Sequence, residues 1–158
     1  MATEFEPFPK IARMKREQII TEKIDGTNAQ VYIRELEDEV EYAKATNDPF
    51  CLHIEGGFSA GDSSFALYAG SRKRWIAPEG TPGLAKGCDN FAFARWVTAH
   101  LEELMKLGPG RHYGEWYGMG VQRGYAMSER RFALFNCARW GEHNPNTPAC
   151  CDVVPRID

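Results

Sequence analysis

The sequence lacks three features that would place it in common functional classes. None of its hydrophobic runs reaches the roughly 20 residues that a membrane-spanning helix needs, and none of its glycine-rich stretches carries the Gly-Lys-Ser/Thr signature of a phosphate-binding loop. Positive charge is not in excess, because 19 lysines and arginines against 22 aspartates and glutamates give a net charge of −3. That balance argues against a globally basic nucleic-acid-binding protein but permits local basic patches. We expect no membrane partner and a single domain spanning residues 1–158.

The cysteines also lack the spacing of a metal or redox motif. No two of the five are arranged as Cys-x-x-Cys, which a zinc finger or a thioredoxin-like site would need. An odd number of cysteines without that spacing is typical of reduced thiols, so the sequence predicts a cytoplasmic protein. The five are Cys51, Cys88, Cys137, Cys150 and Cys151.

Short alternating runs and one longer amphipathic segment predict an α+β fold. A helix is expected over residues 89–107, where large apolar side chains recur at helical spacing and Asp89 or Asn90 can cap the start. The acidic stretch 35–41 is expected to be an exposed turn, and residues 42–48 are expected on the surface. Strands are expected at residues 18–21, 29–33, 50–54, 65–70, 111–117, 130–137 and 151–155.

The stretch Glu22-Lys23-Ile24-Asp25-Gly26-Thr27-Asn28 stands between two β-prone runs. A lysine amine becomes a nucleophile once it loses its proton, and a nearby cation favours that loss by lowering the amine pKa. Asp25 and Asn28 carry oxygen atoms that can hold a hydrated metal ion beside Lys23 through water, without direct ligation. Gly26 allows the backbone to approach a ligand closely. The alternative interpretation is a surface hairpin with charged residues near its tip.

Two further stretches combine charge with aromatic side chains. Ser71-Arg72-Lys73-Arg74-Trp75 places basic residues beside a tryptophan, which suits phosphate contact, although a solvated strand end has the same composition. Glu115 lies within the aromatic run 113–117. A buried glutamate is unfavourable unless it is paired or binds a ligand, so Glu115 is a candidate binding residue.

Taken in order, these stretches resemble the motifs of the covalent nucleotidyltransferases, which include RNA ligases, DNA ligases and mRNA-capping enzymes. Residues 22–28 resemble motif I, Gly70-Ser71-Arg72 resembles motif Ia, residues 113–122 are similar to motif III, and residues 132–136 resemble motif IIIa. The resemblance covers roughly residues 5–137 and is greatest to the RNA ligase 2 branch. It implies an ATP-grasp-like α+β nucleotidyltransferase domain of twisted antiparallel sheets with a flanking helix, and an ATP cleft between the sheets.

For motif I, the resemblance implies chemistry centred on Lys23. This lysine would attack the α-phosphate of ATP and keep AMP as a phosphoramide. Glu22 would help to read the adenine edge, and Asn28 would support a metal-bound water near the lysine or the sealing step. Asp25 and Gly26 complete the motif.

For the later motifs, the resemblance implies a nucleotide-binding role for each matched residue. Arg72 would contact the nucleotide sugar or phosphate, since an arginine fork suits phosphate oxygens. Glu115 would accept a hydrogen bond from the ribose, and Phe135 would stack on the adenine. Gln122 ends the Gly-x-Gly-x-Gln tail of motif III that is seen in the RNA ligase 2 branch.

The sequence departs from the family pattern after Asn136. Neither the Glu-Gly strand of motif IV nor the Lys-x-Lys strand of motif V is visible there. In the family those lysines contact the α-phosphate and that glutamate helps to bind the metal. The chain is therefore expected to correspond to the N-terminal part of the family domain. It would be a piece of a longer ligase, a protein completed by a partner chain, or a reduced form that binds nucleotide or RNA.

The function that the resemblance implies is ATP-dependent RNA ligation. AMP would pass from Lys23 to an RNA 5′-phosphate, and a 3′-hydroxyl would then seal the strand. Mg²⁺ or Mn²⁺ would neutralise the triphosphate charge. Two alternatives stay open: a DNA ligase or capping-type guanylyltransferase, and a non-catalytic nucleotide- or RNA-binding module derived from a ligase.

Overall fold

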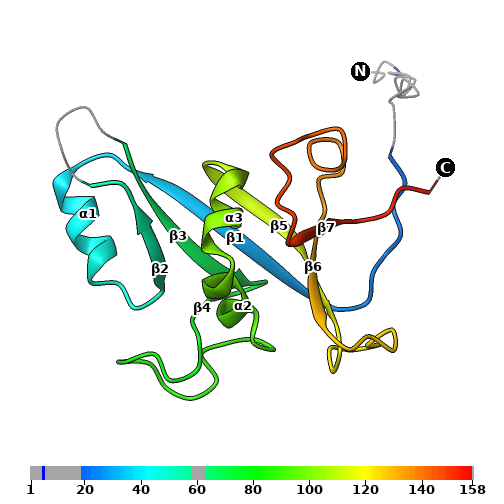
Figure 1. Ribbon diagram of the computed structural model, residues 1–158, viewed down its shortest axis with the longest axis horizontal. Helices are drawn as coiled ribbons and strands as arrows, with labels where there is room; N and C mark the ends of the chain where they lie inside the picture. Colours follow the sequence, from blue (N-terminus) through cyan, green and yellow to red (C-terminus); the bar gives the residue numbers. More distant parts are fainter. Residues whose placement is uncertain (1–4, 6–18, 58–62, 158) are drawn as a thin grey trace.

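The computed structural model describes residue 5, residues 19–57 and residues 63–157 (Figure 1). Within these residues the elements follow the order β1, α1, β2, β3, β4, α2, α3, a 3-10 turn (η1), β5, β6 and β7. The strands are β1 (Thr27–Leu36), β2 (Cys51–Glu55), β3 (Ser64–Ser71), β4 (Trp75–Ile76), β5 (Gly110–Gly118), β6 (Arg130–Leu134) and β7 (Cys151–Val153). The helices are α1 (Glu39–Thr46), α2 (Phe93–Ala99), α3 (Leu101–Leu104) and the 3-10 turn η1 (Met105–Leu107).

The described strands form one seven-stranded sheet with β1 near its centre. Its order is β2-β3-β1-β5-β6-β7, with β4 paired to β3. All neighbours are antiparallel except β6 and β7, which run parallel. The predicted α+β class is confirmed. The described strands form a single sheet and not the two sheets expected to enclose a cleft, so a ligand site on these strands lies on a face of that sheet.

The two faces of the sheet have different coverings. One face packs against α2, α3 and η1 around a large apolar core that includes Val31, Leu67, Phe93, Trp116 and Phe132. Figure 1 shows α2 and α3 lying across the strands on this side. Because side chains alternate along a strand, the residues between these core positions point to the opposite face. That second face carries two smaller clusters, one of which α1 covers through Ala45.

The helix expected over residues 89–107 is divided into α2, α3 and η1. His100 interrupts it with φ −128° and ψ 28°, away from helical values. The helix also starts later than expected, at Phe93. Asp89 lies before the first turn, and its carboxylate accepts hydrogen bonds from the backbone N–H groups of Ala94 (2.8 Å) and Arg95 (3.1 Å). Asp89 therefore stabilises the helix start from outside the helix.

Residues 35–48 contain a helix that the sequence did not predict. Asp38 caps the start of α1, because its Oδ1 accepts a hydrogen bond from the backbone N–H of Glu41 at 2.8 Å. Ala45 is the buried residue of this helix, so the hydrophobic pattern along it is weak. The exposed turn expected over residues 35–41 is wrong at both ends: Glu35 and Leu36 belong to β1, where Leu36 is buried, and α1 begins at Glu39.

The strand expected at residues 18–21 is not formed in its described part. Gln18 lies outside the described residues, and Thr21 makes an isolated bridge to Arg156. Two backbone hydrogen bonds flank this bridge. The N–H of Ile157 donates to the carbonyl of Ile20 (2.7 Å), and the N–H of Glu22 donates to the carbonyl of Pro155 (2.9 Å). Lys23 is therefore preceded by backbone that pairs with residues 155–157, and not by one arm of a hairpin (Figure 1).

Candidate active site

The central strands bring several of the predicted site residues to the face opposite the α2–α3 core. Asn28 on β1 lies directly across from Glu115 on β5. Gln30 lies across from Tyr113 on β5 and from Gly70 on β3. Directly paired residues in antiparallel strands point to the same face, so these side chains share one surface.

A pocket of about 460 Å³ opens on this surface. It combines three of the predicted residues, which are separated widely in sequence: Asn28 from β1, Arg72 from the turn after β3, and Phe135 directly after β6. The Phe135 side chain is 43% exposed, so its ring is accessible to a ligand. The complete lining is Asn28, Ala29, Gln30, Ser71, Arg72, Tyr113 and Phe135.

Sequence reasoning missed two pocket residues, Gln30 and Tyr113. Both could have been found from strand alternation, because Gln30 is two residues after Asn28 and Tyr113 is two residues before Glu115. Tyr113 is 53% exposed, and its backbone carbonyl accepts a hydrogen bond from the backbone N–H of Phe135 (3.0 Å). Two exposed aromatic residues therefore line the pocket, Tyr113 on β5 and Phe135 just after β6.

Glu115 is buried beside the pocket, with 8% of its surface exposed. Its Oε2 accepts from the backbone N–H of Gly26 at 3.2 Å. Its Oε1 is buried and has no hydrogen-bond partner within the part of the chain that the structure describes. An orphaned carboxylate oxygen is unfavourable in the free protein and is suited to accept a hydroxyl from a ligand.

The surroundings of Glu115 change its acidity. Burial raises the pKa of the carboxyl above its ordinary value, and the charge of Asp25 raises it further. The Gly26 N–H and the charge of Lys23 oppose this shift of the pKa. Lys23 and Asp25 are therefore close enough to act on the Glu115 carboxylate, although neither lines the pocket.

Glu115→Gln is expected to preserve or raise the thermal stability of the protein near neutral pH and to weaken nucleotide binding. The effect on stability follows from the raised pKa of the Glu115 carboxyl. A carboxyl with a raised pKa in the folded state loses its stabilising contribution as pH rises through that pKa, whereas glutamine does not titrate. At pH 7 the variant should unfold at the same or a higher temperature than the wild type, and this advantage should shrink as the pH falls toward 4. Adenine nucleotide should bind roughly tenfold or more weakly, because the charged acceptor is lost. Thermal unfolding across this pH range and calorimetric titration measure both effects, and unchanged nucleotide affinity would contradict the role of Glu115.

Gly26 places the Lys23 segment directly against β5. A Cβ atom at this position would collide with the backbone oxygen of Trp116 and would lie 2.9 Å from Tyr117 Cβ. This close approach explains why the backbone N–H of Gly26 reaches Glu115. Glycine is needed here because β5 lies so close, whereas the predicted close approach to a ligand stays a prediction.

One side chain near Lys23 packs against apolar residues, and its neighbours are exposed. Ile24 packs against the cluster of Ala133, Cys137 and Val154, whereas Glu22, Lys23 and Asp25 are exposed. The backbone N–H of Asp25 donates to the hydroxyl of Tyr125 at 2.7 Å. Tyr125 comes from the loop between β5 and β6, and nothing in its local sequence predicted this contact.

Gln122 is the predicted site residue of the motif III tail. It is exposed, follows Val121 in the turn after β5, and has a left-handed backbone with φ 49°. It does not line the pocket.

Two oxygen-bearing residues are available for a metal ion near Lys23. Asp25 and Asn28 are both exposed. Within the described residues no group of three or more histidines, cysteines, aspartates or glutamates is arranged to hold a metal. A Mg²⁺ ion commonly keeps several waters and uses one or two protein oxygens together with substrate phosphates, so this pair fits a water-mediated role.

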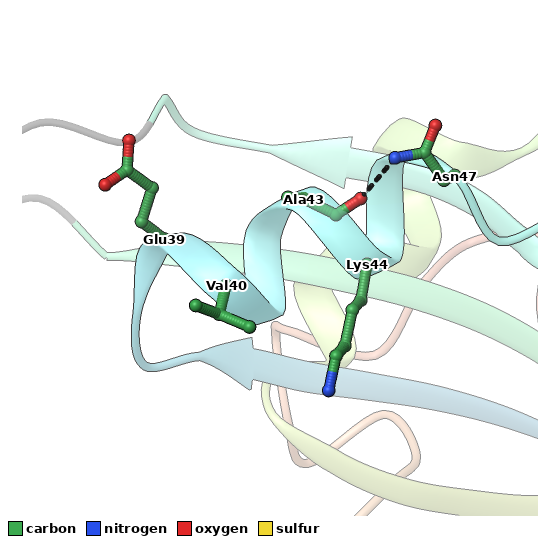
Figure 2. Close-up of a pocket in the computed structure, with 5 residues that line it drawn as sticks. All are labelled: Glu39, Val40, Ala43, Lys44 and Asn47. Carbon is green, nitrogen blue, oxygen red and sulfur yellow. Dashed lines mark hydrogen bonds between the residues drawn. The ribbon is translucent and has the colours of Figure 1, made fainter.

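A second pocket lies on the exposed side of α1 and includes none of the predicted site residues. Figure 2 shows its five lining residues, four from α1 and Asn47 just beyond, with Asn47 Nδ2 donating to the Ala43 carbonyl at 2.9 Å. Lys44 lines this pocket and not the pocket on the sheet. In the part of the chain that the structure covers, no helix has the length and apolar character to cross a membrane.

Comparison with known proteins gave one match. A family model described as RNA ligase matches residues 16–149 of the chain, a range that includes every predicted site residue from Glu22 to Phe135. No curated protein and no solved structure matches the chain.

Proposed function

This chain belongs to the RNA ligase family, and on that premise we propose that it is an ATP-dependent RNA ligase with Lys23 as its nucleophile. The Lys23 amine attacks the α-phosphorus of ATP, the bond to pyrophosphate breaks, and the amine proton passes to solvent. An oxygen of an RNA 5′-phosphate then displaces the lysine and takes the AMP. Finally a 3′-hydroxyl attacks that 5′-phosphate, AMP leaves, and a phosphodiester bond forms.

The pocket on the sheet is the observation that carries this proposal. Asn28, Arg72 and Phe135 are far apart in the sequence, and they line one pocket with the buried Glu115 beside it. A cation, an aromatic face and a carboxylate are the groups that a nucleotide needs for its phosphate, base and ribose. Lys23 is near enough to influence the Glu115 carboxyl, which supports its position at the edge of the same site.

The proposed roles follow these positions. Phe135 stacks on the base, Arg72 contacts the sugar or phosphate, and Glu115 accepts a ribose hydroxyl at its orphaned Oε1. Asn28 lies on the Lys23 side of the pocket and supports the reacting phosphate through water. We keep Glu22 as a proposed contact of the adenine edge and Gln122 as the last residue of the motif III tail, although both lie outside the pocket lining.

A divalent metal ion is part of the proposal. Asp25 and Asn28 would hold it through water, and when bound it would neutralise charge on the triphosphate. We also propose that residues 1–158 act as one adenylyltransferase unit in the cytoplasm.

Joining of RNA ends tests the proposal against its alternatives. The protein is incubated with ATP, Mg²⁺ or Mn²⁺, and labelled RNA with a 5′-phosphate and a 3′-hydroxyl, with DNA of the same sequence in parallel. We expect adenylylated or joined RNA and much less DNA product. Preference for DNA would indicate a DNA ligase, an adduct with GTP and not ATP would indicate a capping-type enzyme, and ATP binding without any adduct would indicate a non-catalytic module.

A further inference from the structure

Gln30 is enclosed by its two neighbouring strands inside the pocket. Gly70 lies across from it on β3, where a Cβ atom would come within 2.8 Å of Gln30 Cγ and 3.1 Å of Nε2. Tyr113 lies across from it on β5. The absence of a side chain at Gly70 therefore makes the space that the Gln30 side chain occupies.

Two neighbours determine which way the Gln30 amide faces. Arg111 Nη1 donates to Gln30 Oε1, and Gln30 Nε2 donates to the Ser71 carbonyl, each at 3.4 Å. A guanidinium can only donate and a carbonyl can only accept. Rotating the amide by 180° would set donor against donor and acceptor against acceptor, so the two contacts together favour one orientation.

Arg111 is itself held in place by aromatic side chains. Its guanidinium lies 4.2 Å from the centre of the Tyr32 ring and 5.7 Å from that of Trp75. These two rings stack on each other at 5.7 Å with an interplanar angle of 18°. The cation–aromatic contacts keep the guanidinium next to Gln30.

We propose that Gln30 selects adenine over guanine in this pocket, with Arg111 as the residue that orients it. An amide oxygen can accept two hydrogen bonds and an amide nitrogen can donate two, so one of each stays available to a ligand. The oxygen accepts from the 6-amino group of adenine, and the nitrogen donates to an adjacent ring nitrogen, as glutamine does when it reads adenine elsewhere. The inference rests on the proposed function only in that the pocket binds a nucleotide.

Guanine presents the wrong groups to an amide in this orientation. Its 6-position carries an acceptor in place of the amino donor. The Gln30 oxygen would face that acceptor directly. A free glutamine could rotate to suit guanine, but here rotation would also break the contacts with Arg111 and Ser71.

Nucleotide binding without chemistry tests the inference. We would titrate the full chain with the α,β-methylene analogues of ATP and GTP, which cannot release pyrophosphate, and with the matching analogue that has hydrogen in place of the 6-amino group. The wild type should prefer the adenine analogue over the other two by roughly 5- to 100-fold. Gln30→Leu should remove most of this preference, leaving only the part that the proposed Glu22 contact supplies. Arg111→Met should raise guanine binding more than it lowers adenine binding, because the freed amide can rotate.

Arg34→Met provides the matched control for the arginine substitution. Arg34 lies on the same strand as Gln30 but pairs with Glu41 at 2.6 Å, outside the pocket. This variant should keep the wild-type preference. Equal binding of adenine and guanine by the wild type, or an unchanged preference in Gln30→Leu and Arg111→Met, would overturn the inference. Adenine preference in a protein that forms no lysine adduct would leave the inference intact and refute the proposed ligation.

Discussion

Lys23→Arg is expected to abolish transfer of AMP to the protein, with a loss of roughly 10³-fold or more. Arginine keeps the positive charge, but its guanidinium stays protonated and cannot act as a nucleophile. Lys23 is exposed, so the substitution disturbs no buried contact. Folding and noncovalent ATP binding should therefore change little while the adduct disappears.

Lys44→Arg is the matched control for this substitution. Lys44 is an exposed lysine on α1 and lines a different pocket (Figure 2). The control should form the same amount of adduct as the wild type, measured as radioactivity transferred from ATP labelled at the α-phosphate. An adduct of undiminished yield in Lys23→Arg would refute the assignment of the nucleophile.

Gly26→Ala should cause the second largest loss, because it acts on folding and on the site together. The added methyl group would collide with backbone of Trp116 and would also come within 3.1 Å of Glu115 Cγ. Backbone atoms in a paired strand cannot move aside easily, so the Lys23 segment must shift away from β5. We expect a loss of about 1–3 kcal/mol in the free energy of unfolding. Adduct formation should fall by roughly 10²-fold, because a small displacement of a reacting group has a large effect on rate.

Gly57→Ala separates this effect from a general effect of replacing glycine. Nothing lies within 4 Å of the Cβ position of Gly57. Chemical denaturation and adduct yield should match the wild type in this control. A Gly26→Ala protein as stable and as active as the Gly57→Ala protein would contradict the close packing of motif I against β5.

The strands were largely predictable from the sequence, whereas the helices were less so. The expected strands coincide with β1, β2, β3, β5 and β6, although β3 buries side chains on both faces of the sheet and does not alternate. The weakly amphipathic α1 was missed because it buries little more than Ala45. Helical spacing across residues 89–107 did not reveal the interruption at His100, which depends on backbone angles at one residue.

The candidate site was predictable where a sequence motif and a strand position coincide. The grouping of Asn28, Arg72 and Phe135 follows from strand order, and the sequence suggested it only through the order of motifs. The orientation of Gln30 depends on Arg111, which is 81 positions away in the chain. The contact of Tyr125 with Asp25 spans 100 positions and comes from a loop, so no local pattern could predict it.

The most direct measurement of the central proposal is the location of AMP on the protein. The full chain is incubated with ATP and Mg²⁺ or Mn²⁺, digested, and its peptides are analysed by mass spectrometry. We expect one AMP on the peptide that contains Lys23 and unmodified peptides for the other lysines. AMP on a different lysine, or ATP that binds to the protein and leaves every peptide unmodified, would contradict a nucleotidyltransferase mechanism at Lys23.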